Sequence, residues 1–234
     1  MDNKYFDFFF HEIASITGVM KQSATHLLEA FNDNKSIDKQ LIKAHAGNLL
    51  GRVELIEMYI KIVTLMNNPE YYQNSRPRII DLHEAFTRFG RIMRLKHTKE
   101  KKSVEIETIS GINLKPLIDV FAIAPFIVLD NAFKYSAIGE EIQVVFSQVG
   151  SNKLNIEVTS CGPYVEEAEL PLLTNYKYRG VNAGISQVSG HGLGLYFLKE
   201  ICEISSVELS IHSRKLGYQL NGVDYGLFTV IFRI

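Results

Sequence analysis

The sequence predicts an α+β protein with two parts, a helical hairpin over residues 1–67 and an α/β sandwich over residues 78–234. Apolar residues recur at intervals of three and four through the first part, which is the period of an amphipathic helix. The stretch between the parts, NNPEYYQNSRPR, contains two prolines and interrupts that period. Helical and strand-like segments then follow, as expected for one sheet covered on one face by helices.

The first helix is predicted over YFDFFFHEIASITGVMKQSATHLLEAF. Its apolar stripe is narrow, as in a coiled coil, and consists of Phe6, Phe9, Ile13, Ile16, Met20, Ala24, Leu27 and Phe31. On a wheel of about 100° per residue, the polar residues cluster opposite: Lys4, Asp7, His11, Ser15, Gly18, Gln22, Thr25 and Glu29. His11 is therefore expected to face water.

A second helix is predicted over about residues 37–66, after a break at NDNKS. It has two apolar stripes. One contains Ile37, Leu41, Ala44, Leu55, Met58, Ile62 and Leu65; the other contains Ile42, Leu49, Val53, Ile56, Ile60 and Val63. A helix that is apolar on two sides must be covered on two sides, so we expect two copies of the hairpin to pair into a dimeric four-helix bundle.

The second part contains candidate helices and strands in turn. Asp81 is a candidate N-cap for the helix LHEAFTRFGRIMRLK, and LIDVFAIAPFIVLDNAFKYS is predicted to be a long apolar helix. The predicted strands are SVEIETIS, IQVVFSQV, LNIEVTS, VELSIHSR and GLFTVIFRI. The third strand is expected to end at Ser160, with Gly162 and Pro163 turning the chain.

Composition narrows the possible classes of protein. A chain of 234 residues, 46% hydrophobic and 22% charged, is large enough to bury a core in each of two units. The net charge of −1 gives no sign of a nucleic-acid partner or an anionic membrane surface. No apolar run approaches the ~18 residues of a membrane span, and no signal-peptide pattern opens the chain.

The two cysteines fit an intracellular setting. Cys161 and Cys202 match no metal-ligand spacing, so a reducing cytosol is the simplest environment. We expect a cytoplasmic protein, connected to a membrane only through a sensor region outside this sequence. The basic run from Arg88 to Lys102 is expected to be a solvated helix end.

His11 is followed directly by Glu12 on the polar face of the first helix. A neutral imidazole can attack a phosphoryl group, and a neighbouring carboxylate can orient the ring and take its proton. The alternative is a surface histidine without a role. The choice depends on whether a phosphoryl donor binds elsewhere in the chain.

Asn131 interrupts an apolar helical run, where an amide needs a partner. Its side-chain carbonyl oxygen is a candidate ligand for Mg²⁺. Lys134 lies one turn later on the same face of the helix, where its ammonium group could bind a phosphate. The alternative is that both residues occupy a fraying helix end.

Glycines at 190, 192 and 194 precede a predicted helix that starts at about Leu193. Glycines let a backbone approach a ligand closely, and a helix N-terminus directs free N–H groups at an anion. The spacing G-x-G-x-G fits neither a dinucleotide-binding fingerprint nor a P-loop. On this segment alone, a flexible loop ending at a helix cap explains the glycines equally well.

The order of these segments resembles the transmitter core of sensor histidine kinases: a His-Glu pair on a helical hairpin, then DNAFKYS, SCGPYV, KYRGVNA and GHGLGLYFLKEI. Residues 1–67 resemble the dimerisation and phosphoacceptor hairpin of that family. Residues 78–234 resemble its Bergerat-type (GHKL) ATP-binding domain.

The resemblance implies a role for each matching residue. Asn131 would hold Mg²⁺, Lys134 and Tyr135 would line the triphosphate and nucleoside, and Ser160 and Gly162 would lie at the adenine. The phosphates of ATP would be held by the glycine stretch, which comprises Gly190, His191, Gly192, Leu193, Gly194 and Leu195.

The resemblance also implies a catalytic set. Residues from about Thr174 to His191 would form a mobile lid over ATP, and Arg179 would stabilise charge on the transferring phosphoryl group. His11 would accept the phosphoryl group and Glu12 would be its base. The partners would be a second copy of the chain, bound through the hairpin, and the receiver domain of a response regulator.

Three positions depart from the family pattern. The family usually has aspartate at Ser160, where it reads the adenine amino group, a second asparagine at Ile127, and often a proline at Ile16. Loss of one charge-assisted hydrogen bond costs about 1.5–3 kcal/mol, or about 10- to 100-fold in nucleotide affinity.

Three functions follow as hypotheses. The leading one is an ATP-dependent protein-histidine kinase that phosphorylates His11 and passes the phosphoryl group to an aspartate of a response regulator. The second is a phosphotransfer or scaffold protein with a degenerate ATP-binding domain, which Ser160 and Ile127 favour. The third is an ATPase of the chaperone, gyrase or mismatch-repair type, which the absence of a glutamate at Ile127 disfavours.

Overall fold

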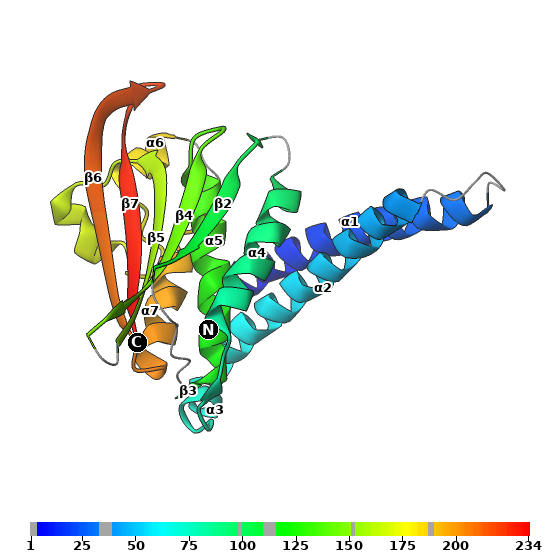
Figure 1. The fold of residues 1–234 in the computed structure, drawn as a ribbon, viewed down its shortest axis with the longest axis horizontal. Helices are drawn as coiled ribbons and strands as arrows, with labels where there is room; N and C mark the ends of the chain where they lie inside the picture. The colour runs from blue at the N-terminus through cyan, green and yellow to red at the C-terminus, as the bar shows by residue number, and fades with distance from the viewer. Residues whose placement is uncertain (1–3, 33–38, 98–99, 110–115, 151–152, 187–189) are drawn as a thin grey trace. The chain divides into compact units, whose positions relative to one another are not determined.

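A computed structural model describes the chain except residues 1–3, 33–38, 98–99, 110–115, 151–152 and 187–189 (Figure 1). The chain divides into two compact units, Met1–Pro69 and Glu70–Ile234. None of the described helices is both long enough and apolar enough to cross a membrane.

The first unit is a hairpin of two long helices, α1 (Lys4–Asn32) and α2 (Lys39–Asn67). The rings of Phe9 and Tyr59 lie 5.9 Å apart, and those of His26 and His45 lie 5.5 Å apart. The start of α1 therefore meets the end of α2, so the helices are antiparallel.

Burial in the hairpin follows the predicted stripes. Phe9 and Ile16 of α1 are buried, as are four residues of the first α2 stripe, Leu55, Met58, Ile62 and Leu65. Large apolar side chains nevertheless remain exposed on both helices: Phe10, Leu28, Phe31, Leu50, Val53 and Ile60. The predicted polar face of α1 is exposed wherever its side chains are described, at Ser15, Gly18, Gln22, Thr25 and Glu29.

The second unit is built on a mixed five-stranded sheet with the order β2-β4-β5-β7-β6. The strands are β2 (Ser103–Thr108), β4 (Glu141–Val149), β5 (Lys153–Pro163), β6 (Glu208–Leu220) and β7 (Val223–Arg233). β2 and β4 are parallel, and the other neighbouring pairs are antiparallel. A separate two-stranded sheet joins β1 (Arg78–Ile79) to β3 (Pro116–Leu117).

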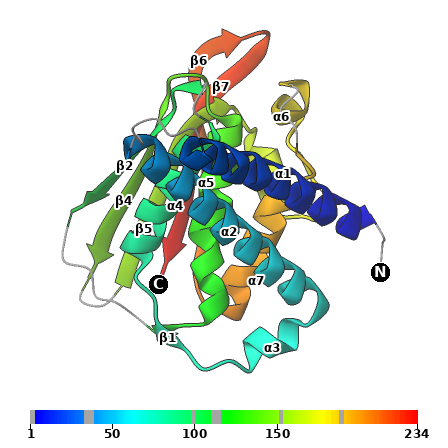
Figure 2. The same ribbon diagram turned by 90° about the vertical axis from the view of Figure 1, so that its right-hand side faces the viewer.

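Three helices cover one face of the large sheet: α4 (Leu82–Lys96), α5 (Ala124–Tyr135) and α7 (Gly194–Ile204). α4 packs on β2, α5 on β5 and α7 on β6, with α5 between the other two helices. Figure 1 shows the three on one side of the strands, and in Figure 2 they lie in front of the sheet. The core between the layers is rich in fully buried aromatic rings: Phe86, Phe89, Phe121, Phe133, Phe146 and Phe232.

Shorter elements complete the unit. They are α3 (Pro69–Gln73), η2 (Asp119–Ile123), η3 (Glu167–Leu172) and α6 (Val181–Ile185). The predicted cap at Asp81 is confirmed, because its carboxylate accepts a hydrogen bond of 2.9 Å from the backbone N–H of Glu84.

Two local predictions are wrong. The long apolar helix is divided into η2 and α5, because Pro125 lies in the first turn of α5, where proline starts a helix rather than continuing one. β5 does not end at Ser160; it continues through Gly162 and Pro163, which pair with Gly226 and Tyr225 of β7.

The basic run was expected to be solvated, and this is wrong at its last residue. Lys102 is buried, with 7% of its surface exposed. Near the start of the run, Arg88 is half-buried and its guanidinium lies 5.0 Å from the ring centroid of Phe89.

Candidate functional site

Three segments that the sequence predicted to act together meet at the C-terminal end of α5. A Cβ added to Gly162 of β5 would lie 2.9 Å from the main-chain oxygen of Tyr135. A Cβ added to Gly190 would lie 3.1 Å from the hydroxyl oxygen of the same tyrosine. The end of α5, the middle of the sheet and the glycine stretch are therefore in direct contact, and glycine at 162 is required by that approach.

The predicted metal and phosphate residues lie on α5 itself. Asn131 is half-buried, and its amide makes no hydrogen bond to the residues that the structure describes. Lys134 forms an ion pair with Asp130, one turn earlier on the same helix. Asp130 was missed by sequence reasoning, although an acidic residue four positions before a lysine is a detectable helical pattern.

Asn131 fits a magnesium site of the kind that uses few protein ligands. Mg²⁺ takes oxygen ligands and is often held by one or two side chains together with substrate phosphates. No group of three or more His, Cys, Asp or Glu side chains suited to a metal occurs within the described parts of the chain. The Asn131 amide oxygen, which has no hydrogen-bond partner among the described residues, is therefore compatible with a metal held jointly with a nucleotide.

Gly192 holds the glycine stretch against the preceding segment. Its φ is +67°, and a Cβ here would lie 2.5 Å from the carbonyl oxygen of Tyr178 and 2.6 Å from the carbonyl carbon of Lys177. Both the backbone conformation and the space exclude a side chain. The predicted lid and the glycine stretch are thus packed backbone to backbone.

The glycine stretch leads into the N-terminus of α7. Leu193 is the buried N-cap residue and contributes no side-chain hydrogen bond to the first turn. A Cβ on Gly194 would lie 3.7 Å from the Cγ2 of Ile127 on α5. The first N–H groups of α7 have no partner within the helix and receive no hydrogen bond from the side chain of Leu193. They are therefore suited to donate hydrogen bonds to a bound anion. Of the other predicted residues, His191 is exposed and Leu195 is half-buried.

The predicted lid, from about 174 to 191, is tied to η3 by Glu169. One carboxylate oxygen of Glu169 accepts hydrogen bonds from the hydroxyl of Tyr178 at 2.8 Å and the backbone N–H of Val181 at 2.9 Å. The hydrogen bond to Glu169 is the main cause of a raised pKa for Tyr178, which keeps the phenol protonated. Sequence reasoning missed Glu169, because nothing in the local pattern distinguishes it from its exposed acidic neighbours.

Arg179 makes a local contact within the lid. Its Nη2 donates a hydrogen bond of 3.1 Å to the carbonyl oxygen of Ala183 in α6. The same helix is held to the residue that follows β5 by Asn182, whose side chain donates a hydrogen bond of 2.8 Å to the carbonyl oxygen of Tyr164.

Ser160 lies on β5 and is buried, two residues before Gly162. The next residue, Cys161, is a free buried cysteine whose sulfur lies 3.0 Å from the hydroxyl oxygen of Tyr218. Burial raises the pKa of the Cys161 thiol, and the hydrogen bond to Cys161 raises that of Tyr218 to about 12. Both groups are therefore protonated at neutral pH, and neither supplies the carboxylate that the resemblance implies at Ser160.

The predicted acceptor belongs to the first unit. His11 and Glu12 are helical residues of α1, and their side chains lie outside the described part of the chain. A groove of about 410 Å³ in the second unit runs between η3, α7 and β6 and is lined by Leu170, Cys202 and Leu209 among others. Apart from Thr174, where the predicted lid begins, none of the predicted site residues lines this groove.

Residues 126–230 match the family of histidine kinase-, DNA gyrase B- and HSP90-like ATPases. The matched region contains every predicted nucleotide-site residue from Asn131 to Leu195. The comparison with curated protein sequences gave no match.

Solved structures, among them two of histidine kinases, share the fold. The mycobacterial sensor histidine kinase MprB has a TM-score of 0.52 at 20% identity, covering 67% of this chain and 97% of that one. The catalytic domain of histidine kinase ThkA has a TM-score of 0.53 at 16% identity, covering 68% and 95%. Full-length ShkA in complex with AMPPNP has a TM-score of 0.54 at 11% identity, covering 98% of this chain and 45% of that one.

The predicted fold class is confirmed. The chain is an α+β protein in which a helical hairpin precedes a Bergerat-type (GHKL) fold with one mixed five-stranded sheet.

Gly192→Ala is expected to destabilise the second unit more than Gly222→Ala. Both glycines have positive φ, +67° and +76°, but a Cβ on Gly222 meets nothing within 4 Å. Both alanines cost roughly 1–2 kcal/mol in backbone strain, and only Gly192→Ala adds a steric cost of about 1–3 kcal/mol. Denaturant unfolding without nucleotide measures the difference, and equal losses would contradict the close packing at Gly192.

Proposed function

We propose that the chain is the kinase core of a two-component sensor histidine kinase. It binds ATP in the second unit, phosphorylates His11 of the hairpin, and passes the phosphoryl group to an aspartate on a response-regulator receiver domain.

The observation that carries this proposal is the meeting of three predicted segments around Tyr135. Gly162 and Gly190 each approach that residue closely, and Gly192 and Gly194 continue from the second contact into α7. This arrangement lies inside the region that matches an ATPase family. A glycine stretch that leads into a helix N-terminus, with the Asn131 side chain making no hydrogen bond to the described residues, is suited to the phosphates of a nucleoside triphosphate.

In the proposed reaction a ring nitrogen of His11 attacks the γ-phosphorus of ATP and forms a phosphorus–nitrogen bond. The bond from the γ-phosphorus to the bridging oxygen breaks, ADP leaves with that electron pair, and Glu12 takes the proton from the other ring nitrogen. Lys134 and Arg179 stabilise the charge on the transferring group. Asn131 would hold Mg²⁺ through its amide oxygen, and the bound ion would neutralise charge on the phosphates.

The hairpin is proposed to dimerise. Leu28, Leu50 and Ile60 are among the large apolar side chains that remain exposed on α1 and α2. Several large exposed apolar side chains on two adjacent helices are typical of an interaction site. A second hairpin would cover it and complete a four-helix bundle.

The alternative function is a phosphotransfer or scaffold protein in which the ATP-binding domain is degenerate. Ser160 and Ile127 favour it, since neither supplies the polar group that the family resemblance implies. Ile127 is buried and faces Gly194, so an apolar side chain occupies a position next to the glycine stretch.

His11→Gln is expected to abolish autophosphorylation. The wild-type chain, incubated with Mg²⁺ and γ-labelled ATP, should acquire acid-labile and base-stable label, as a phosphorus–nitrogen bond requires. His26→Gln is the matched control, because His26 is an exposed histidine on the same helix. Label that persists in His11→Gln, or is lost in His26→Gln, would contradict the acceptor assignment.

Ser160→Asp is expected to raise the affinity for ATP by about 10- to 100-fold, because a carboxylate forms a stronger hydrogen bond to an amino group than a hydroxyl does. The gain should be selective for ATP over GTP, since guanine presents a carbonyl oxygen where adenine has its amino group. Ser160→Ala is the control for the hydroxyl alone. Titration calorimetry measures both nucleotides, and an unchanged or weaker ATP affinity would place the adenine away from Ser160.

A further inference from the structure

Lys102 is an unusual lysine, because it is buried directly before β2. Only 3% of its side chain is exposed. Burial of an ammonium group is costly unless charged and hydrogen-bonding partners replace water. The partners that replace water around the Lys102 ammonium group therefore indicate a structural role for this lysine.

The ammonium group of Lys102 caps the C-terminal end of α5. Its Nζ donates a hydrogen bond of 2.6 Å to the carbonyl oxygen of Phe133 and lies 2.5 Å from a carboxylate oxygen of Glu100. The Phe133 carbonyl is one of the last four in α5, which have no partner within the helix. A cation at this end also complements the helix dipole.

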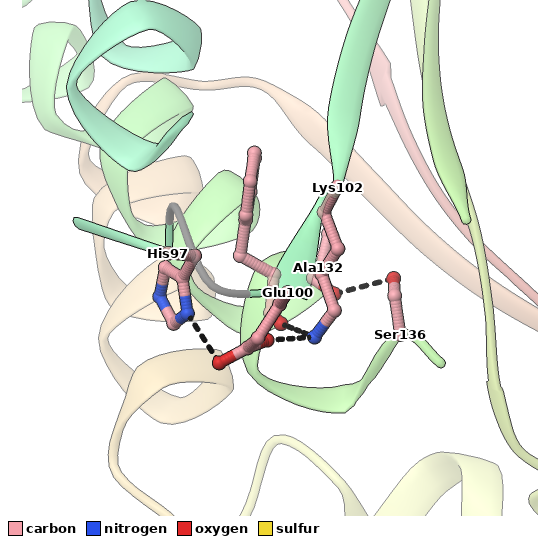
Figure 3. Close-up of polar contacts among 6 residues, drawn as sticks. His97, Glu100, Lys102, Ala132 and Ser136 are labelled. Carbon is pink, nitrogen blue, oxygen red and sulfur yellow. Dashed lines mark hydrogen bonds and ion pairs between the residues drawn. The ribbon is translucent and has the colours of Figure 1, made fainter. Parts of the chain in front are cut away.

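Glu100 is held from a second side. His97, the C-cap residue of α4, has its Nδ1 3.1 Å from the other carboxylate oxygen of Glu100. Figure 3 shows His97, Glu100 and Lys102 directed toward one another beside the last turn of α5. Burial raises the pKa of Glu100, but hydrogen bonds from Lys102 and His97 together outweigh burial and hold the pKa below its ordinary value.

The backbone of Glu100 supports the same region. Its carbonyl oxygen accepts a hydrogen bond of 2.9 Å from the N–H of Gly139, in the turn that follows α5. Ser136, the C-cap of α5, bonds back to the carbonyl oxygen of Ala132 through its hydroxyl at 2.6 Å and its N–H at 2.9 Å. The last turn of α5 is thus fixed on the side of Lys102.

The same turn carries Lys134 and Tyr135. Tyr135 has little freedom on its other side, where Gly162 and Gly190 approach it at 2.9 Å and 3.1 Å, measured to the Cβ positions they lack. A shift of a few tenths of an ångström at the end of α5 would therefore alter the contacts that join helix, strand and glycine stretch.

We propose that Lys102, oriented by Glu100 and His97, is a positioning residue for the nucleotide site, because it fixes the α5 turn that bears Lys134 and Tyr135. The expected effect on nucleotide binding rests on the proposed function. The contacts of Lys102 with Phe133 and Glu100 lie within the second unit.

The test compares Lys102→Met with the double variant Lys102→Met and Glu100→Gln. The single variant removes the cation that caps α5 and leaves His97 as the remaining partner of the Glu100 carboxylate, so it should lose both stability and affinity. Only Lys102 of this ion pair is buried, and replacing Glu100 as well removes the charge that has lost its cation, which is expected to restore stability. The denaturant midpoint of unfolding of the double variant is therefore expected to return most of the way to that of the wild type. Its affinity for Mg²⁺-AMPPNP should stay about 10-fold weaker than that of the wild type.

Two controls complete the comparison. Lys102→Arg retains the positive charge and a donor for the Phe133 carbonyl oxygen, so it should bind AMPPNP within about threefold of the wild type. Leu154→Ala opens a cavity at the opposite end of β5 from Gly162 and should lower stability without changing affinity. Affinity that recovers together with stability in the double variant would overturn the proposal.

A readout without nucleotide separates this proposal from the proposed function. Amide exchange at Ser136, whose N–H bonds to Ala132, should be faster in the double variant than in Leu154→Ala. If the wild type does not bind AMPPNP, the proposed function fails, and this exchange comparison still decides the role of Lys102. Equal exchange in the two variants would overturn that role.

Discussion

The approach of two glycines to Tyr135 is the constraint on which the candidate site depends. Gly162 allows β5 to run beside the main chain at the end of α5, and Gly190 allows the glycine stretch to reach the tyrosine hydroxyl. Protein interiors have no spare volume for an added side chain at such contacts. The positions of Asn131 on α5 and of the α7 N-terminus follow from this packing. Lys102 fixes the remaining side of the same turn through the carbonyl oxygen of Phe133.

Much of the fold could be predicted from local pattern, because helix and strand periods are properties of short segments. The buried stripe that includes Leu55 and Met58, the Asp81 cap and all five strands of the large sheet are examples. The errors arose where a residue that usually ends an element has another role. Pro125 begins α5, and Gly162 and Pro163 remain within β5, where the absence of a Cβ is needed for contact with Tyr135.

The polar contacts of the site could be predicted less well, since they join residues that are distant in the sequence. Lys102 belongs to a run of basic residues that favours a solvated helix end, and its burial depends on the position of Phe133, 31 residues later. Glu169 bonds to Tyr178 and Val181 across the predicted lid. The local sequence does not distinguish a solvated carboxylate or ammonium group from a buried one. Only the tertiary arrangement decides which it is.

The central claim is that the three segments around Tyr135 form one nucleotide site. Amide hydrogen exchange of the chain with and without Mg²⁺-AMPPNP tests this claim most directly. Binding should slow exchange at residues 131–136, 160–162 and 190–195 with the same dependence on nucleotide concentration. The groove between η3, α7 and β6, which includes Leu209 and Ile211, should show no change. Protection confined to that groove, or to only one of the three segments, would contradict the account.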